Sequence, residues 1–152
     1  MGWQDFYRRR DELNAAVEQG ELRTSDVFTD TAELLLALHH RWTQRLTARV
    51  ELATVDPAAD LVDAVGEAWR RTAEDNAQLR ELLDKHAAEL RPFTEAEHRM
   101  LASSAGLTEE TDDAEETAAI GAAFVALQRS APVRGGRGNP VERLFRRLLP
   151  SA

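Results

Sequence analysis

The residues best suited to metal chemistry in this chain are its histidines and the carboxylates near them. His39 and His40 are adjacent, and Glu95-Ala96-Glu97-His98 is the only Glu-x-x-His segment. Adjacent residues on a helix point about 100° apart, so His39 and His40 cannot chelate one ion together. Helical di-iron proteins need the Glu-x-x-His motif twice, with two further glutamates. The sequence therefore predicts no metal site and no cofactor.

The sequence also offers little for nucleophilic catalysis. It has no cysteine and no Gly-x-Ser-x-Gly segment, and no Ser/His/Asp set can be assembled. The glycine-rich stretch Gly135-Gly136-Arg137-Gly138 lacks the Lys-Ser/Thr pair of a phosphate-binding loop. We therefore expect no catalytic residues and favour a non-enzymatic protein. A carboxylate-metal enzyme is the weakest alternative.

Four large side chains, Trp42, Trp69, Met100 and Phe124, fall on apolar stripes of predicted helices. Such side chains either fill a core or line a small apolar pocket between helices, where helical bundles often bind ligands. In the second interpretation, His39 or His98 would supply the polar contact that orients the ligand. These six residues are the predicted ligand-binding set.

The elements that would position these residues are helices from end to end. A first helix carries Trp3, Phe6, Tyr7, Leu13 and Val17 on one face, and Gly20 ends it. Asp30 and Glu33 have capping-box spacing and begin a second helix. Its predicted core face follows a 3.6-residue period: Leu35, Leu38, Trp42, Leu46, Val50 and Ala53.

Predicted helix starts and helix ends divide the rest of the chain. Asp56-Pro57 predicts the start of a third helix, and Asp75-Asn76 predicts a break. Pro92 is expected to end the helix before it, and Thr94 with Glu97 to cap a short helix ending near Gly106. Two more helices are predicted over residues 113–130 and from Asn139-Pro140 to about residue 149.

These elements predict an all-α fold: a single-domain bundle of about six or seven helices. Residues 1–25 would form an N-terminal helix and loop, and residues 26–150 one compact helical unit. The 152 residues carry a net charge of −8, which argues against a nucleic-acid partner. No apolar run approaches the length of a membrane span, so no membrane partner and a cytoplasmic location are expected.

The segment 113–130 is rich in small residues that let another helix approach closely. We expect it to lie centrally or at a subunit contact, with a homodimer formed together with the last helix. The predicted dimer contacts are Ala119, Ala122, Ala123, Ala126, Leu144 and Leu148. The arginines of the last helix, Arg143, Arg146 and Arg147, fit solvent exposure better than a membrane anchor.

One segment adds a family resemblance. Phe28-Thr29-Asp30-Thr31-Ala32-Glu33-Leu34-Leu35-Leu36-Ala37-Leu38 resembles the junction of tetracycline-repressor-family regulators where the DNA-binding unit meets the long fourth helix. The segment 68–83 and the order of the last two helices are also similar. In that family the last two helices pair across a dimer as a four-helix bundle. Only about 25 residues precede Val27, whereas the family's helix-turn-helix takes roughly 45.

The resemblance therefore implies a C-terminal ligand-binding and dimerisation domain without a DNA-binding head. The leading hypothesis is a non-enzymatic regulatory domain that dimerises and binds a small apolar ligand. The alternative is a protein–protein interaction module that binds its partner through an exposed helical face. That module predicts an apolar surface patch in place of an internal cavity.

Overall fold

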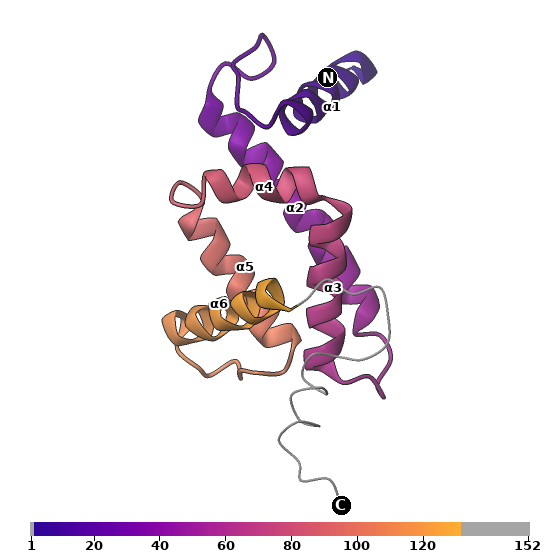
Figure 1. Cartoon of the computed structure of the whole chain (residues 1–152), viewed down its shortest axis with the longest axis vertical. Helices are drawn as coiled ribbons and strands as arrows, with labels where there is room; N and C mark the ends of the chain where they lie inside the picture. The colour runs from indigo at the N-terminus through magenta and orange to yellow at the C-terminus, as the bar shows by residue number, and fades with distance from the viewer. Residues whose placement is uncertain (1, 132–152) are drawn as a thin grey trace, which may run out of the picture.

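The structure is a computed structural model and describes residues 2–131. Over that range it contains six helices and no strand, so the predicted all-α fold class is confirmed (Figure 1). The helices are α1 (Trp3–Gln19), α2 (Thr31–Ala53), α3 (Leu61–Asp75), α4 (Ala77–Lys85), α5 (Arg91–Ser104) and α6 (Ala114–Ser130).

Local capping explains several of these boundaries as predicted. Gly20 adopts a left-handed conformation with φ of 69° and ends α1. Asp30 accepts a hydrogen bond from the Ala32 amide over 2.9 Å at the start of α2. Asp113 does the same for Glu116 at the start of α6, over 3.3 Å. The predicted break at Asp75-Asn76 is also present, between α3 and α4.

The predicted start of α3 at Asp56-Pro57 is wrong. Asp56 accepts from the Ala58 amide over 2.9 Å, but only a turn follows it. The helix begins at Leu61, where Asp60 accepts from the Asp63 amide over 3.1 Å. Two aspartates compete as caps here, and the second immediately precedes the apolar repeat that α3 buries.

The predicted role of Pro92 is also wrong. The preceding helix ends at Lys85, and Pro92 lies in the first turn of α5. A proline is tolerated there because the amides of the first turn have no intrahelical acceptor. Thr94 and Glu97 therefore lie inside α5, and Glu97 is buried instead of capping a helix start.

The core lies around α2, which packs against α1, α3 and α4, while α5 packs closely on α6 (Figure 1). The predicted core face of α2 is buried apart from Ala53, which is half-buried. From the other helices, the largest buried apolar side chains are Leu13, Val65, Trp69, Leu79, Leu82, Leu83, Leu101, Phe124 and Val125.

Gly121 sets the close approach of α6 to α5. A Cβ atom at this position would lie 1.9 Å from the backbone oxygen of His98, a separation that no side chain can occupy. Ala118, one turn before Gly121, is also buried. The small residues of α6 thus serve, in part, a helix contact within this chain.

The helix predicted from Asn139 to about residue 149, with Leu144 and Leu148, lies outside the described residues. Among the helices of residues 2–131, none combines the length and the apolar character needed to cross a membrane.

Candidate functional site

The first turns of α1 present an aromatic face to solvent. The exposed fractions of Trp3, Phe6 and Tyr7 are 78%, 60% and 46%. Their ring centroids lie 5.6–6.4 Å apart, so the three side chains form one continuous cluster. Contiguous exposed apolar surface of this kind is typical of a binding site. We call these three residues the α1 aromatic face.

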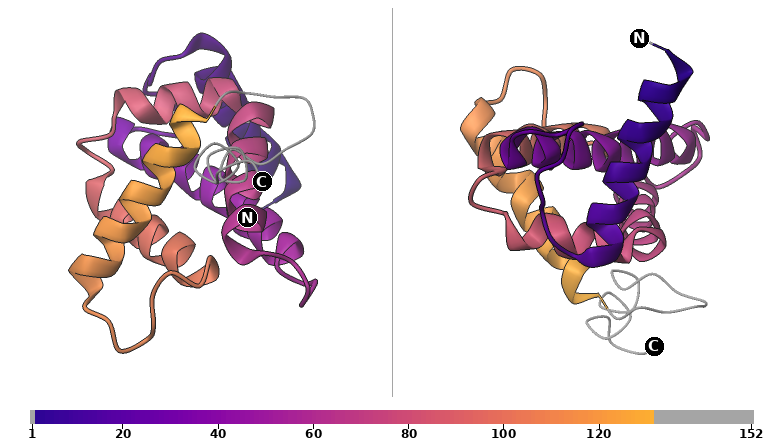
Figure 2. Two further views of the ribbon diagram at one scale, coloured as in Figure 1. Left: turned by 60° about the horizontal axis from the view of Figure 1, so that its bottom comes forward. Right: turned by 90° about the horizontal axis from the view of Figure 1, so that it is seen from above.

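The rest of α1 holds the helix on the body of the protein. Leu13 and Ala16 are buried, and Val17 packs against the core. Arg9 lies 3.9 Å from Glu33 and stacks over the Phe28 ring at 4.7 Å. The first turns of α1 extend beyond the other helices (Figure 2, right). The α1 aromatic face is thus presented on a helix whose C-terminal half is packed on the body of the protein.

Basic side chains accompany the α1 aromatic face. Arg8, Arg9 and Arg10 follow Tyr7, with Asp5 as the only acidic residue in the first eight residues of α1. The Arg10 guanidinium lies 4.9 Å from the centroid of the Tyr7 ring and contacts Asp11 at 3.2 Å. The exposed end of α1 is therefore both aromatic and cationic.

A second notable feature lies in the interior, where Glu97 is 7% exposed. Its Oε1 atom accepts a hydrogen bond from Trp42 Nε1 over 2.7 Å and lies 3.9 Å from His39 Nε2. The Arg80 guanidinium lies over the Trp42 ring at 4.5 Å. We call this group the Glu97 cluster; it comprises His39, Trp42, Arg80, Asp84, Glu97 and Arg129.

Asp84 closes the cluster by joining two arginines from different helices. Arg129 of α6 donates to both Asp84 oxygens, over 2.9 and 3.0 Å. Arg80 contacts the same carboxylate at 3.0 Å. Arg129 also lies over the Trp69 ring at 5.2 Å, and Trp69 packs edge-on against Trp42 at 6.2 Å. The Glu97 cluster thus connects α2, α4, α5 and α6.

Burial sets the direction of the pKa shift at Glu97 and His39, whereas two arginines set it at Asp84. Burial raises the pKa of Glu97, while Arg80 and the Trp42 hydrogen bond act in the opposite direction. Burial lowers the pKa of His39, and Arg80 and His40 lower it further, so the imidazole is neutral at pH 7. Burial alone would raise the pKa of Asp84, but Arg129 and Arg80 outweigh it and the pKa is lowered.

A buried acid beside a neutral histidine is a familiar acid–base arrangement. Here, however, the His39 and Glu97 side chains are only 10% and 5% exposed, and Trp42 already donates to Glu97 Oε1. A substrate could not reach these groups without movement of the helices. We therefore interpret the cluster as a polar network that fixes the positions of four helices.

The structure places the six predicted ligand-binding residues in the core, in the Glu97 cluster and on α5. Trp42, Trp69 and Phe124 are buried in the core, and Met100 packs against it. His39 lies in the Glu97 cluster, and its ring centroid is 5.9 Å from that of Phe93. His98 is half-buried on α5, where burial and then Arg129 lower its pKa. The structure brings His39, Trp42 and Trp69 together, and a ligand at this place stays a prediction.

The four alanines predicted as dimer contacts lie on α6. Ala119, Ala123 and Ala126 are exposed, and Ala122 is half-buried. Leu127 beside them is 50% exposed. Leu144 and Leu148 lie outside the described residues, so the homodimer also stays a prediction.

Within residues 2–131, no group of three or more His, Cys, Asp or Glu side chains is arranged to hold a metal ion. Comparisons with protein-family models, curated proteins and solved structures found no match to this chain. The resemblance to tetracycline-repressor-family regulators therefore stays a prediction.

Proposed function

We propose that this protein is a helical interaction module that binds a protein partner through the α1 aromatic face. The observation that carries the proposal is the 78% exposure of Trp3 in a cluster with two further exposed aromatic rings. Tryptophan and tyrosine dominate the energetics of many interfaces because they bury a large area at a small entropic cost.

The spacing of the residues suits insertion of the helix into a groove. Trp3, Phe6, Tyr7 and Arg10 follow the i, i+3, i+4, i+7 pattern by which a helix places one face in an apolar groove. The arginines beside this face favour a partner whose groove has an acidic rim. The proposed partner is thus a protein whose surface groove has an apolar floor and carboxylates around its rim.

Anchoring of α1 supports the proposal in a second way. The C-terminal half of α1 is packed on the body through Leu13, Ala16 and Val17. The binding helix is therefore already formed before the partner arrives, which reduces the conformational entropy lost on binding.

The test is affinity capture from a lysate of the native source, followed by reconstitution with the purified partner. The variant carries Trp3→Ala, Phe6→Ala and Tyr7→Ala. The matched control carries Leu52→Ala and Val55→Ala, two apolar residues that are 76% and 73% exposed elsewhere on the surface. We expect one partner that binds the wild type and the control, is lost from the aromatic variant, and binds more weakly as salt is added.

Three outcomes would overturn the proposal. The first is equal capture by the aromatic variant and the wild type. The second is self-association through α1 with no other protein bound. The third is binding to anionic lipid vesicles that depends on the aromatic residues, again without a protein partner. The dimer through α6 and the pocket for a small apolar ligand remain separate hypotheses.

A further inference from the structure

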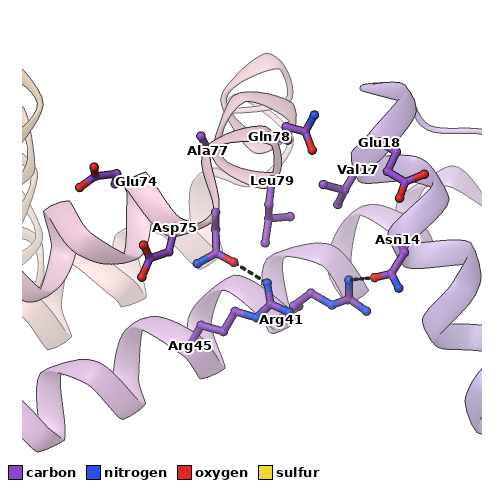
Figure 3. A pocket seen from close by; sticks show the side chains of 11 residues that line it. Asn14, Val17, Glu18, Arg41, Arg45, Glu74, Asp75, Ala77, Gln78 and Leu79 are labelled. Carbon is purple, nitrogen blue, oxygen red and sulfur yellow. Dashed lines mark hydrogen bonds between the residues drawn. The ribbon is translucent and has the colours of Figure 1, made fainter.

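The structure contains a surface groove of about 400 Å³ between α1, α2 and the α3–α4 junction (Figure 3). Its volume lies within the range of small-molecule sites. None of the six residues predicted to bind a ligand lines it. The wall is formed by Asn14, Val17, Glu18, Arg41, Arg45, Glu74, Asp75, Asn76, Ala77, Gln78 and Leu79.

Two arginines of α2 form the charged floor of the groove. Arg41 and Arg45 are one helical turn apart, so their positive charges repel. Arg41 donates to Asn14 Oδ1 over 2.8 Å, and Arg45 donates to Asn76 Oδ1 (Figure 3). Both acceptors are neutral amides. They fix the positions of the guanidinium groups without compensating their charge.

Burial and two neighbouring arginines act together on the Arg41 guanidinium. Burial lowers its pKa, and Arg45 and Arg10 lower it further. Within residues 2–131, neither Arg41 nor Arg45 has a carboxylate within 4.0 Å, whereas Arg49 on the next turn binds Asp75 at 2.7 Å. Each guanidinium has five N–H donors, so most of them remain available to a ligand.

The other walls restrict the class of anion. Val17, which is half-buried, provides apolar surface near the arginines, whereas Leu79 beside it is only 2% exposed. Glu18 and Glu74 lie at the two sides of the groove (Figure 3). The two glutamates, together with Asp75, which also lines the groove and pairs with Arg49, would repel a multiply charged anion such as a phosphate. A single carboxylate with an apolar body meets less repulsion and also uses the apolar wall.

We propose that this groove binds a small organic carboxylate, with the carboxylate held by Arg41 and Arg45 and the apolar body against Val17. Paired N–H donors of a guanidinium match the two oxygens of a carboxylate. The inference goes beyond the proposed function, because it concerns a small molecule and the C-terminal half of α1.

The test uses hexanoate as the probe and follows the arginine Nε–H resonances of the full-length protein by NMR. We expect hexanoate to shift the Arg41 and Arg45 signals saturably, and hexan-1-ol and sulfate to leave them in place. The double variant Arg41→Gln/Arg45→Gln should weaken hexanoate binding at least about tenfold. Arg71→Gln is the control, since Arg71 is exposed and lies outside the groove.

A second variant keeps the test valid if the double variant fails to fold. Glu74→Gln removes a negative charge from the side of the groove and should strengthen hexanoate binding by about threefold. No saturable shift with hexanoate would overturn the proposal. Equal binding by the double variant would do the same, and so would sulfate binding as tightly as hexanoate.

Discussion

The indole N–H of Trp42 on α2 donates to the carboxyl of Glu97 on α5 over 2.7 Å, with both side chains buried. This bond joins residues that are 55 positions apart in the sequence. A buried donor that loses its acceptor retains the full cost of its desolvation. The bond therefore gives Glu97 a specific role in the stability of the fold.

Replacing Glu97 should separate the effect of the acceptor from that of the charge. Glu97→Ala leaves the Trp42 N–H without an acceptor, and we expect a loss of about 3 kcal/mol in the free energy of unfolding. Glu97→Gln keeps an oxygen in place and should lose about 1 kcal/mol. Urea denaturation measures both.

The control is Glu95→Ala, which removes only the solvent-facing contact with Arg91 and should change stability by less than about 1 kcal/mol. Equal losses for Glu97→Ala and Glu97→Gln would contradict the role of the hydrogen bond.

The pH dependence of stability should have opposite signs for Glu97 and Asp84. The pKa of Glu97 is raised in the folded protein. Its contribution to the free energy of unfolding is therefore fully present below the pKa of the unfolded state, about 4.3. That contribution is lost as pH rises through the pKa of the folded state. The pKa of Asp84 is lowered. The contribution of Asp84 to the free energy of unfolding is present above the pKa of the unfolded state, about 3.9. That contribution is lost as pH falls through the pKa of the folded state.

The measurement is urea denaturation across the acidic range for the wild type, Glu97→Gln and Asp84→Asn. The stability difference between wild type and Glu97→Gln should decrease as pH rises. The difference between wild type and Asp84→Asn should decrease as pH falls. Parallel curves for the wild type and both variants would show that neither group titrates as the structure indicates.

The sequence predicted the helices well where the signal is local. Asp30 and Gly20 act at helix ends through bonds to residues two and four positions away, so their spacing alone identifies them. Local spacing gave the wrong start for α3, where two aspartates both had the position of an N-cap. Asp56 and Asp60 both resemble caps, and only the packing of the apolar repeat of α3 selects the second.

The burial of Glu97 and the exposure of the α1 aromatic face were missed because both depend on tertiary contacts. Thr94 and Glu97 have the spacing of a capping box, yet Glu97 also lies four residues before the buried Leu101 on the same stripe. That second pattern was the available signal for an interior carboxylate. The aromatic residues of α1 share a face with Leu13. Nothing in the sequence shows that the other helices cover only the C-terminal half of α1.

Close contact between α5 and α6 makes Gly121 sensitive to substitution. Alanine is favoured over glycine in a helix by about 1 kcal/mol. At position 121, however, the new Cβ would lie 1.9 Å from a backbone oxygen, so the two helices must separate. We expect Gly121→Ala to destabilise the protein by about 2 kcal/mol or more in chemical denaturation. Ala119→Ser on the exposed side of α6 serves as the control. An unchanged or increased stability of Gly121→Ala would contradict the observed packing.

The α1 aromatic face should contribute little to folding. Substituting Trp3, Phe6 and Tyr7 by alanine removes exposed rings, so we expect a change in unfolding free energy within about 0.5 kcal/mol. Leu13→Ala on the same helix removes a buried side chain and should lose about 2 to 3 kcal/mol. Thermal and urea denaturation compare the two. A large loss in the aromatic variant would mean that these rings pack on the body.

The most direct measurement of the proposed function is site-specific photo-crosslinking from α1. A photoreactive phenylalanine analogue is placed at position 6, and at position 52 as the control, in protein incubated with a lysate of its native source. Binding through α1 predicts one discrete, heavier adduct with another protein from position 6 and none from position 52. Absence of that adduct, or the same adduct from both positions, would contradict binding through the α1 aromatic face.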